Sequence, residues 1–121
     1  AARSGNKSSG YKYAGSNNLD KVAWYSSNSG NKTHQVGTKQ PNELGIYDMT
    51  GNVWEWCQDW YDENYYKNSP NNNPKGASNG DYRVLRGGSW DSSDYVSRLS
   101  VRYRNFPINW VDNSGFRLVQ D

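Results

Sequence analysis

Two carboxylates in this chain flank a glycine-containing turn in a way that suits a hard cation. Asp48 and Glu55 lie on either side of Gly51, Asn52 and Val53. Calcium takes about six to eight oxygen ligands, mixing carboxylates with main-chain carbonyls, and a glycine lets a carbonyl turn inward. The spacing therefore permits a calcium-type site. The alternative is that Asp48 and Asn52 are turn residues and Glu55 is a solvated strand residue.

Other combinations that could support catalysis are incomplete. Ser89 follows two glycines, but a Ser-His-Asp arrangement would have to use His34, the only histidine. Asp91 and Asp94 could suggest the paired carboxylates of a glycosidase, yet solvated loop acids are the simpler interpretation. Cys57 is the only cysteine, so an internal disulfide is impossible and a buried, unreactive thiol is expected. No glycine-rich phosphate loop follows a strand and opens a helix.

Short strands and long loops must position these residues. Residues 53–60 alternate with a period of two and are rich in Trp, which predicts a strand. Shorter strands are predicted at residues 22–25, 82–85 and 116–119. Residues 15–38 and 61–81 are rich in Gly, Ser, Asn or Pro, so they are predicted to be mostly loop. The pattern indicates a small, loop-rich and mostly β domain.

Size and composition bound the class of protein. The chain has 121 residues, enough for a single domain with a modest core. Hydrophobic residues make up 33% of it and the mean hydropathy is -1.13, but six Trp and ten Tyr supply large rings, so an aromatic core is expected. A formal charge of +2 without a basic run argues against a nucleic-acid partner, and no apolar stretch is long enough for membrane insertion.

Three separated motifs occur in a fixed order: Gly51–Trp56, Arg86–Trp90 and Gly115–Val119. This series resembles the formylglycine-generating enzyme (sulfatase-modifying factor) family. The resemblance implies an α+β, loop-rich domain with a C-type lectin-like fold. The opening segment, residues 1–5, is similar to one that lies well inside that domain. Residues 1–121 would then cover its C-terminal half to two-thirds, either as a fragment or as a natural minimal version.

Calcium ligands can be carried over from the family position by position. In the resembled enzymes a structural calcium is held within the first motif. The matching ligands are the carboxylates and carbonyls of Asp48, Gly51, Val53 and Glu55. A second family calcium would fall on Asn18, Leu19, Asn28 and Gly30, with two of them supplying backbone oxygen. The resemblance therefore implies one or two structural calcium ions.

The copper ligands of the family are missing. Formylglycine-generating enzymes hold copper with two cysteines that lie five residues apart after a Gly-Gly-Ser-aromatic segment. The matching positions here are Ser92 and Ser97. Soft thiolates select Cu(I), whereas hydroxyls at neutral pH are poor ligands for it. We therefore expect no copper and no catalysis of this kind.

Between Trp90 and Gly115 the composition is typical of a binding surface. Rigid aromatic residues are mixed with adaptable Ser and Asn, as in antibody paratopes, and the apolar residues follow no period that would bury them all. The predicted ligand-binding residues are Asp91, Ser92, Ser93, Asp94, Tyr95, Val101, Tyr103, Asn105, Phe106, Ile108, Asn109, Trp110, Val111 and Asp112. An ordinary polar surface of the family would have a comparable composition.

Residues 91–114 are also similar to the variable region of the variable proteins of diversity-generating retroelements. Those proteins carry a C-type lectin domain of the same branch, and their variable residues arise by mutation at template adenines. The resemblance implies a non-catalytic domain that binds a protein or glycan on a cell or phage surface, with Trp54 and Trp90 supporting the variable face from beneath. Such a function favours an extracellular, cell-surface or virion location. The alternatives are a sulfatase-modifying enzyme domain and a structural domain of a surface or phage protein.

Overall fold

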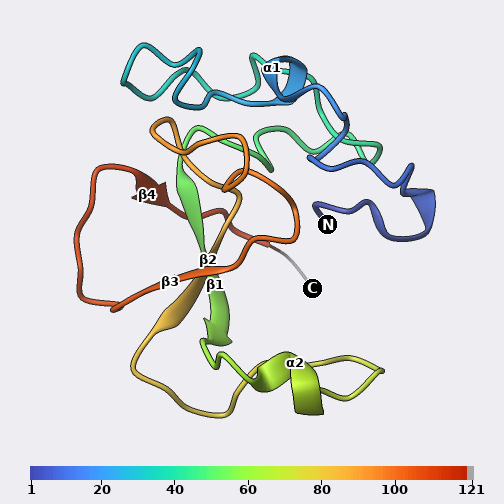
Figure 1. Cartoon of the computed structure of the whole chain (residues 1–121), viewed down its shortest axis with the longest axis vertical. Helices are drawn as coiled ribbons and strands as arrows, with labels where there is room; N and C mark the ends of the chain where they lie inside the picture. The colour runs from blue at the N-terminus through green and yellow to red at the C-terminus, as the bar shows by residue number, and fades with distance from the viewer. Residues whose placement is uncertain (120–121) are drawn as a thin grey trace.

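The computed structural model describes residues 1–119, and four short strands form the centre of the molecule (Figure 1). Strands β1 (Trp54–Trp60), β2 (Arg83–Arg86), β3 (Tyr103–Asn105) and β4 (Ser114–Gly115) form one sheet in the order β3-β2-β1-β4. The helices are the short η1 (Gly5–Lys7), α1 (Leu19–Val22) and α2 (Tyr65–Asn68). The architecture is the small, loop-rich α+β arrangement that the sequence predicts.

Strand β1 is the longest element and carries the sheet. It pairs antiparallel with β2, with Trp56 opposite Leu85, and parallel with β4, with Trp54 opposite Ser114. The predicted strands at 53–60 and 82–85 are confirmed to within about one residue, because period two is a direct signal for a strand. The predicted loop at 61–81 is interrupted by α2 and by an isolated bridge between Ala77 and Trp60.

The strand predicted at residues 22–25 is wrong. Val22 is the last residue of the helix α1, and residues 23–25 belong to no strand. Asn18 caps α1: its side-chain oxygen accepts a hydrogen bond from the backbone amide of Asp20 at 3.0 Å. The first and last residues of α1 lie three positions apart and both are buried. Helical spacing therefore buries the apolar residues of this segment.

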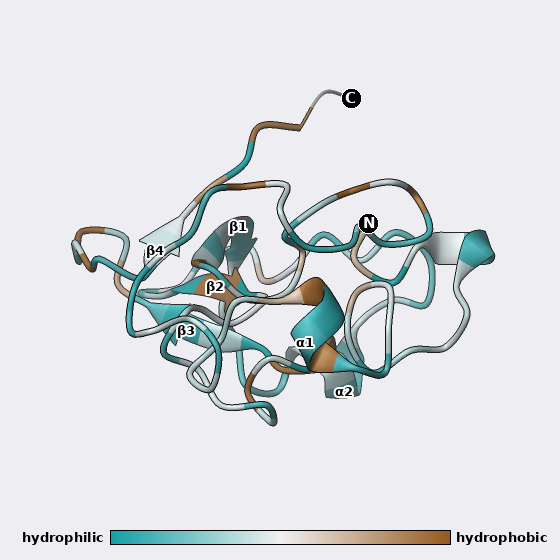
Figure 2. Ribbon diagram, turned by 90° about the horizontal axis from the view of Figure 1, so that it is seen from above, coloured by the Kyte–Doolittle hydropathy of each residue, from teal (hydrophilic) through white to brown (hydrophobic). Residues whose placement is uncertain are grey.

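The terminal strand predicted at residues 116–119 is also wrong. The strand at this end, β4, stops at Gly115. Beyond it Phe116, Leu118 and Val119 are 75%, 89% and 83% exposed, and Figure 2 shows the segment leaving the body of the molecule. Apolar content alone is a weak predictor here, because a strand forms only where a neighbouring strand and a second layer are available to pair and pack with it.

The core is mainly aliphatic, which corrects the expectation of an aromatic core. Its apolar residues are Tyr13, Ala14, Leu19, Val22, Ala23, Trp54, Val84 and Leu85. Only Tyr13 and Trp54 in this set carry rings. Several other rings lie against cationic side chains, such as Trp24 under Lys39 and Trp60 under Arg83. Cation–π contacts hold a ring in place at the surface, so aromatic content does not translate into aromatic burial.

The turn at Gly51 and Asn52 joins three segments. The amide of Asn52 donates to the carbonyl of Trp24 at 2.8 Å, and its carbonyl accepts from the amide of Trp90 at 2.8 Å. The Asn52 side chain accepts from the amide of His34 at 2.9 Å and donates to the carbonyl of the same residue at 3.1 Å. Asn52 is 5% exposed, so these buried polar groups are all satisfied by the protein.

A carboxylate fastens the N-terminal segment to the body. The hydroxyl of Ser4 donates to Glu43 at 2.6 Å and the amide of Ser9 donates to the other carboxylate oxygen at 2.9 Å. These hydrogen bonds, from Ser4 first and Ser9 second, lower the pKa of Glu43 from its ordinary value to about 2. The ionised form of Glu43 is therefore the one that the folded state favours.

Among the described helices, none has the length and apolar character of a membrane span.

The substitution Gly51→Ala should strongly destabilise the fold. Gly51 has φ +77°, and an added Cβ would lie 2.4 Å from the carbonyl oxygen of Trp24. The left-handed backbone and this contact together should lower the unfolding free energy by about 3 kcal/mol or more. Gly30→Ala is the matched control: Gly30 has φ +62° with nothing within 4 Å, so about 1 kcal/mol is expected. Urea denaturation measures both, and equal losses would contradict the packing argument.

The substitution Glu43→Gln should destabilise the protein only where Glu43 is ionised. A folded-state pKa of about 2, below the ordinary value of 4.5, gives a contribution that is complete above about pH 4.5 and is lost as the pH falls towards 2. The difference in unfolding free energy between wild type and variant should therefore be present at neutral pH and shrink at low pH. Urea denaturation at the two pH values tests this, and a pH-independent difference would refute it.

Candidate functional site

Residues 91–114 form an irregular excursion that carries several strongly exposed aromatic and aliphatic side chains. Trp110 is 97% exposed, Ile108 82%, Tyr95 63% and Tyr103 56%. Of the predicted ligand-binding residues, Asp91, Ser93, Asp94, Tyr95, Tyr103, Phe106, Ile108, Asn109, Trp110, Val111 and Asp112 are exposed. The half-buried members are Val101 and Asn105, and Ser92 is buried.

The two ends of this excursion are tied together. The side-chain amide of Asn113 donates to the carboxylate of Asp91, at 3.1 Å to the nearer oxygen. The hydroxyl of Ser89 donates to the same carboxylate at 2.5 Å. The amide of Trp54 donates to the carbonyl of Asn113 at 2.8 Å, which fixes the exit on β1. Asp91 was predicted as a ligand-binding residue, and here its carboxylate also closes the base of the loop.

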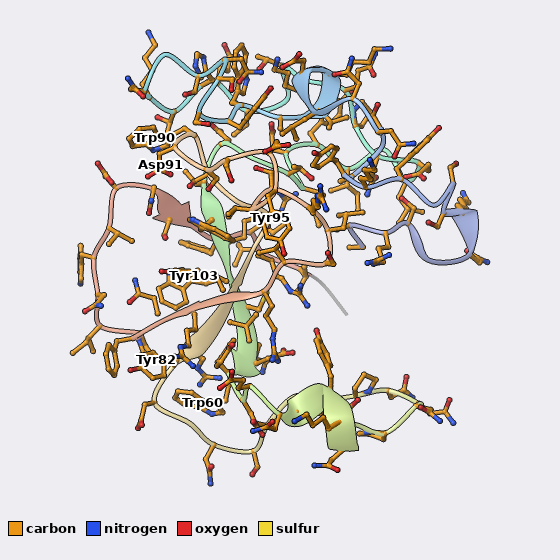
Figure 3. All side chains as sticks on the ribbon, in the orientation of Figure 1. Trp60, Tyr82, Trp90, Asp91, Tyr95 and Tyr103 are labelled. Carbon is orange, nitrogen blue, oxygen red and sulfur yellow. The ribbon has the colours of Figure 1, made fainter. Side chains whose placement is uncertain are left out.

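Within the excursion, β3 places Tyr103 over a buried ring. The rings of Tyr103 and Trp54 stack with centroids 5.4 Å apart, and Trp54 is 7% exposed. Phe106 lies against Tyr82 with centroids 4.3 Å apart. Figure 3 shows Trp90 and Asp91 at one end of this surface, with Tyr103, Tyr82 and Trp60 following along the sheet. The surface therefore rests on a rigid aromatic support.

The two positions that match the copper cysteines converge on a buried hydroxyl cluster. A Cβ at Gly88 would lie 3.0 Å from the Ser97 hydroxyl and 3.5 Å from the Cβ of Ser92. Ser92 accepts a hydrogen bond from the amide of Ser89 at 3.0 Å, and Ser97 donates to the carbonyl of Ser93 at 2.9 Å. Ser92 and Ser97 are 8% and 1% exposed. The hydroxyls thus serve as packed, hydrogen-bonded members of the fold.

The single thiol does not replace them. Cys57 lies on β1 rather than in the segment after Gly88. Burial raises the pKa of the Cys57 thiol, which disfavours the nucleophilic thiolate. Across residues 1–119, no group of three or more His, Cys, Asp or Glu side chains is placed to hold a metal ion.

The four predicted ligands of the first calcium site line one cavity of about 410 Å³, together with Tyr47, Asn52 and Arg117. Asp48, Gly51 and Asn52 all have positive φ, so the backbone curls at this point. Gly51 and Val53 lie outside the strands, and no described residue donates a hydrogen bond to either carbonyl. Free carbonyls beside two carboxylates are the donor set that calcium uses. The residues match the ion in type, but Arg117 engages both carboxylate oxygens of Glu55 and the amide of Gly37 donates to Asp48 at 2.7 Å, so the first site stays a prediction.

An arginine from the third motif shares this cavity, and the sequence interpretation did not assign it. Arg117 forms an ion pair with Glu55 and donates to the carbonyls of Tyr47 and Asp48, both at 3.0 Å. Hydrogen bonding to Glu55 raises the pKa of Arg117 further above its ordinary value. The pairing joins residues 62 positions apart. The only sequence signal for it is that two of the three motifs carry opposite charges.

The second predicted calcium site has fewer free oxygens. The Asn18 side chain accepts from Asp20, and the Leu19 carbonyl accepts from the amide of Ala23 at 3.0 Å. The Asn28 side-chain oxygen accepts from the amide of Tyr25 at 2.9 Å. Gly30 has φ +62°. These oxygens cap a helix and close a turn, so the second site stays a prediction.

Comparison with known proteins places the chain in a family. The sequence profile of the sulfatase-modifying factor enzyme 1-like domain matches residues 1–121. The formylglycine-generating enzyme of Streptomyces coelicolor is 42% identical over 92 residues, which cover 74% of this chain and 29% of that protein. The chaperone protein LppX of Paenibacillus barcinonensis is 38% identical over 138 residues, which cover 99% of this chain and 45% of that protein.

Solved structures agree with this placement. Treponema denticola variable protein 1 superposes with a TM-score of 0.79 at 42% identity, over 87% of this chain and 39% of that one. The chain thus spans less than half the length of each of these relatives. The resemblance to this family, and to a variable protein within its fold, is confirmed. The chain belongs to the sulfatase-modifying factor enzyme 1-like family, which includes the formylglycine-generating enzymes, and has its C-type lectin-like fold.

Proposed function

We propose that this domain is a non-catalytic recognition module that binds a macromolecular ligand, a protein or a glycan, through the surface of residues 91–114. The ligand would be presented on a cell or phage surface, and the domain would act outside the cell or on a virion. Rigid aromatic anchors beside small polar residues are the composition that binding surfaces use. The likeness to a protein named as a variable protein supports a display function.

The observation that carries the proposal is the exposure of Trp110 and Ile108 on a loop whose base is clamped. Large apolar side chains that are 97% and 82% exposed contribute nothing to the core. Interface energy is concentrated in a few residues of this type, with Trp prominent among them. A clamped base keeps these side chains presented in one region, which lowers the ordering cost of binding.

The absence of catalysis in the proposal follows from the cluster around Gly88. Cu(I) needs soft ligands, and the matching positions hold hydroxyls that already have hydrogen-bond partners. The thiol of Cys57 is on another element, and partial burial raises its pKa. A packed cluster of such groups supplies none of the oxidation chemistry of this family.

The substitution Trp110→Ala should remove binding without unfolding the domain. The wild-type chain is first screened on a glycan array and on a panel of purified bacterial and phage surface proteins. Each binder is then retested by surface plasmon resonance. Loss of a fully exposed Trp should weaken binding by about 2 kcal/mol or more, or roughly thirtyfold, if it is an energetic anchor. The free energy of unfolding should change by less than about 0.5 kcal/mol.

Val36→Ala is the matched control for this experiment. Val36 is 73% exposed and lies outside residues 91–114, so its removal should leave binding unchanged. Binders that tolerate Trp110→Ala as well as Val36→Ala would refute the assignment of the surface. Aldehyde production from a cysteine peptide by the purified chain with added copper would overturn the non-catalytic proposal.

Calcium is the cofactor we propose for the cavity at Asp48. The carboxylates of Asp48 and Glu55 and the carbonyls of Gly51 and Val53 would hold it. A calcium ion there would add positive charge beside Arg117, so the two cations would share the oxygens of Glu55. The ion would brace the Gly51–Asn52 turn from the solvent side, which makes it structural.

Calcium should therefore raise the melting temperature. Binding to the folded state alone adds about 2.7 kcal/mol at a hundredfold excess over Kd, which corresponds to a shift of about 5 °C or more for a domain of this size. Differential scanning calorimetry with calcium and with excess chelator measures the shift. Asp48→Ala should abolish the calcium response, whereas Asp112→Ala, an exposed acid elsewhere, should retain it. An identical melting temperature in calcium and in chelator would sink the proposal.

A further inference from the structure

Arginine and aromatic side chains from three segments alternate along one face of the sheet, beside the edge strand β3. Arg104 lies over the rings of Tyr61 and Tyr82, at 4.8 and 5.0 Å from their centroids. Arg102 lies over Tyr61 at 4.5 Å and over Tyr66 at 4.5 Å. Phe106 lies on Tyr82 at 4.3 Å. We call this set, Phe106, Tyr82, Arg104, Tyr61, Arg102 and Tyr66, the arginine–aromatic column.

Arg104 differs from the other arginines near it. The guanidinium of Arg102 donates to the carbonyl of Asp62 at 2.6 Å, and that of Arg86 donates to the carbonyl of Val101 at 2.8 Å. The Arg104 side chain makes no hydrogen bond or ion pair with any residue in 1–119, and it is exposed. Its position is nevertheless fixed by two rings. The column thus presents a held guanidinium whose N–H edge is free.

The free chemistry of the column favours a carboxylate. Guanidinium groups cover Tyr61, and Arg104 and Phe106 both lie against Tyr82, so the two rings that Arg104 contacts are occupied by neighbouring side chains. A planar guanidinium edge matches a carboxylate in a bidentate geometry. The carboxylate of Asp62, next to Tyr61, is engaged elsewhere, because it accepts from the amide of Asn64 at 2.8 Å.

The neighbouring backbone favours a peptide as the carrier of that carboxylate. Strand β3 is at the edge of the four-stranded sheet, and an edge strand presents unpaired backbone groups that an extended peptide can meet. Adjacent side chains on a strand point to opposite faces, so Arg104 and Tyr103 face different ways. Three of the six column residues, Arg102, Arg104 and Phe106, come from residues 91–114, but the column lies on the face of β3 opposite to Tyr103.

We propose that the arginine–aromatic column, on the face of β3 opposite to Tyr103, is a second binding site that accepts an acidic segment of a protein partner. A Glu or Asp side chain of the partner binds the Arg104 guanidinium, and the partner backbone runs beside β3. The proposal does not depend on the ligand proposed for the surface around Tyr103 and Trp110.

A library of random dodecapeptides, displayed on phage and selected against the immobilised chain, tests the site. Peptides enriched on wild type should be rich in Asp and Glu. The most enriched acidic peptide is then synthesised with its Gln or Asn counterpart, and fluorescence anisotropy measures both. Arg104→Gln should weaken binding of the acidic peptide about tenfold or more and leave the amide counterpart unchanged. Arg104→Lys, which keeps the charge without the planar edge, should fall between.

Arg83→Gln is the matched control, because Arg83 also stacks on a ring, Trp60, but its guanidinium donates to the carbonyl of Gln58. Both substitutions remove one charge, so a pure net-charge effect would weaken binding equally and would overturn the proposal. A pool without acidic enrichment, or no enriched pool, would also overturn it. The proposal would also be overturned if a single-stranded oligonucleotide or a sulfated glycan bound more tightly than the acidic peptide and if Arg104→Gln removed that binding. Circular dichroism of every variant verifies the fold.

Discussion

The buried turn at Gly51 and Asn52 is the constraint on which the rest of the structure depends. Asn52 satisfies four backbone groups of Trp24, His34 and Trp90, and Gly51 brings the chain within contact distance of the Trp24 carbonyl. In a fold with so few strand and helix residues, such polar connections replace the regular hydrogen-bond ladders. Because the turn precedes β1 directly, it sets where the longest strand begins. The cation cavity and the loop entrance at Trp90 both take their position from it.

The buried polar side chains that stabilise the fold and the exposed apolar side chains of the proposed binding surface lie in different parts of the molecule. Small buried polar side chains, including Ser89, Ser92 and Ser97, fill the space where the family's metal ligands would lie. These hydroxyls pack in that space and form hydrogen bonds, and a buried hydroxyl without a hydrogen-bond partner would destabilise the fold. The large apolar side chains of residues 106–111 lie outside it. In the proposed function, exposed side chains such as Ile108 and Trp110 would meet the partner, and these are not the groups that hold the fold.

Local patterns in the sequence predicted local structure correctly in part, but they did not predict contacts between distant segments. The period of two at residues 53–60 and the order of three motifs identified β1 and the family. The helix α1 was missed although its cap, Asn18 followed by Asp20, was visible, because Val22 to Tyr25 also suits a strand. The cavity residues Asp48 and Glu55 were predicted together, whereas Arg117 was not assigned to them. Sequence spacing carries no record of a contact across 62 positions, which positive-φ turns create.

The clasp between Asp91 and Asn113 has a consequence for how this sequence can change. The clasp and the Asn113–Trp54 bond hold the ends of the loop through groups that the intervening side chains do not supply. Substitutions at positions such as 108–111 can therefore accumulate with little effect on folding. Selection on these exposed side chains and purifying selection for a folded domain then act on separate codons. The exposed surface can change quickly while the scaffold itself stays under constraint.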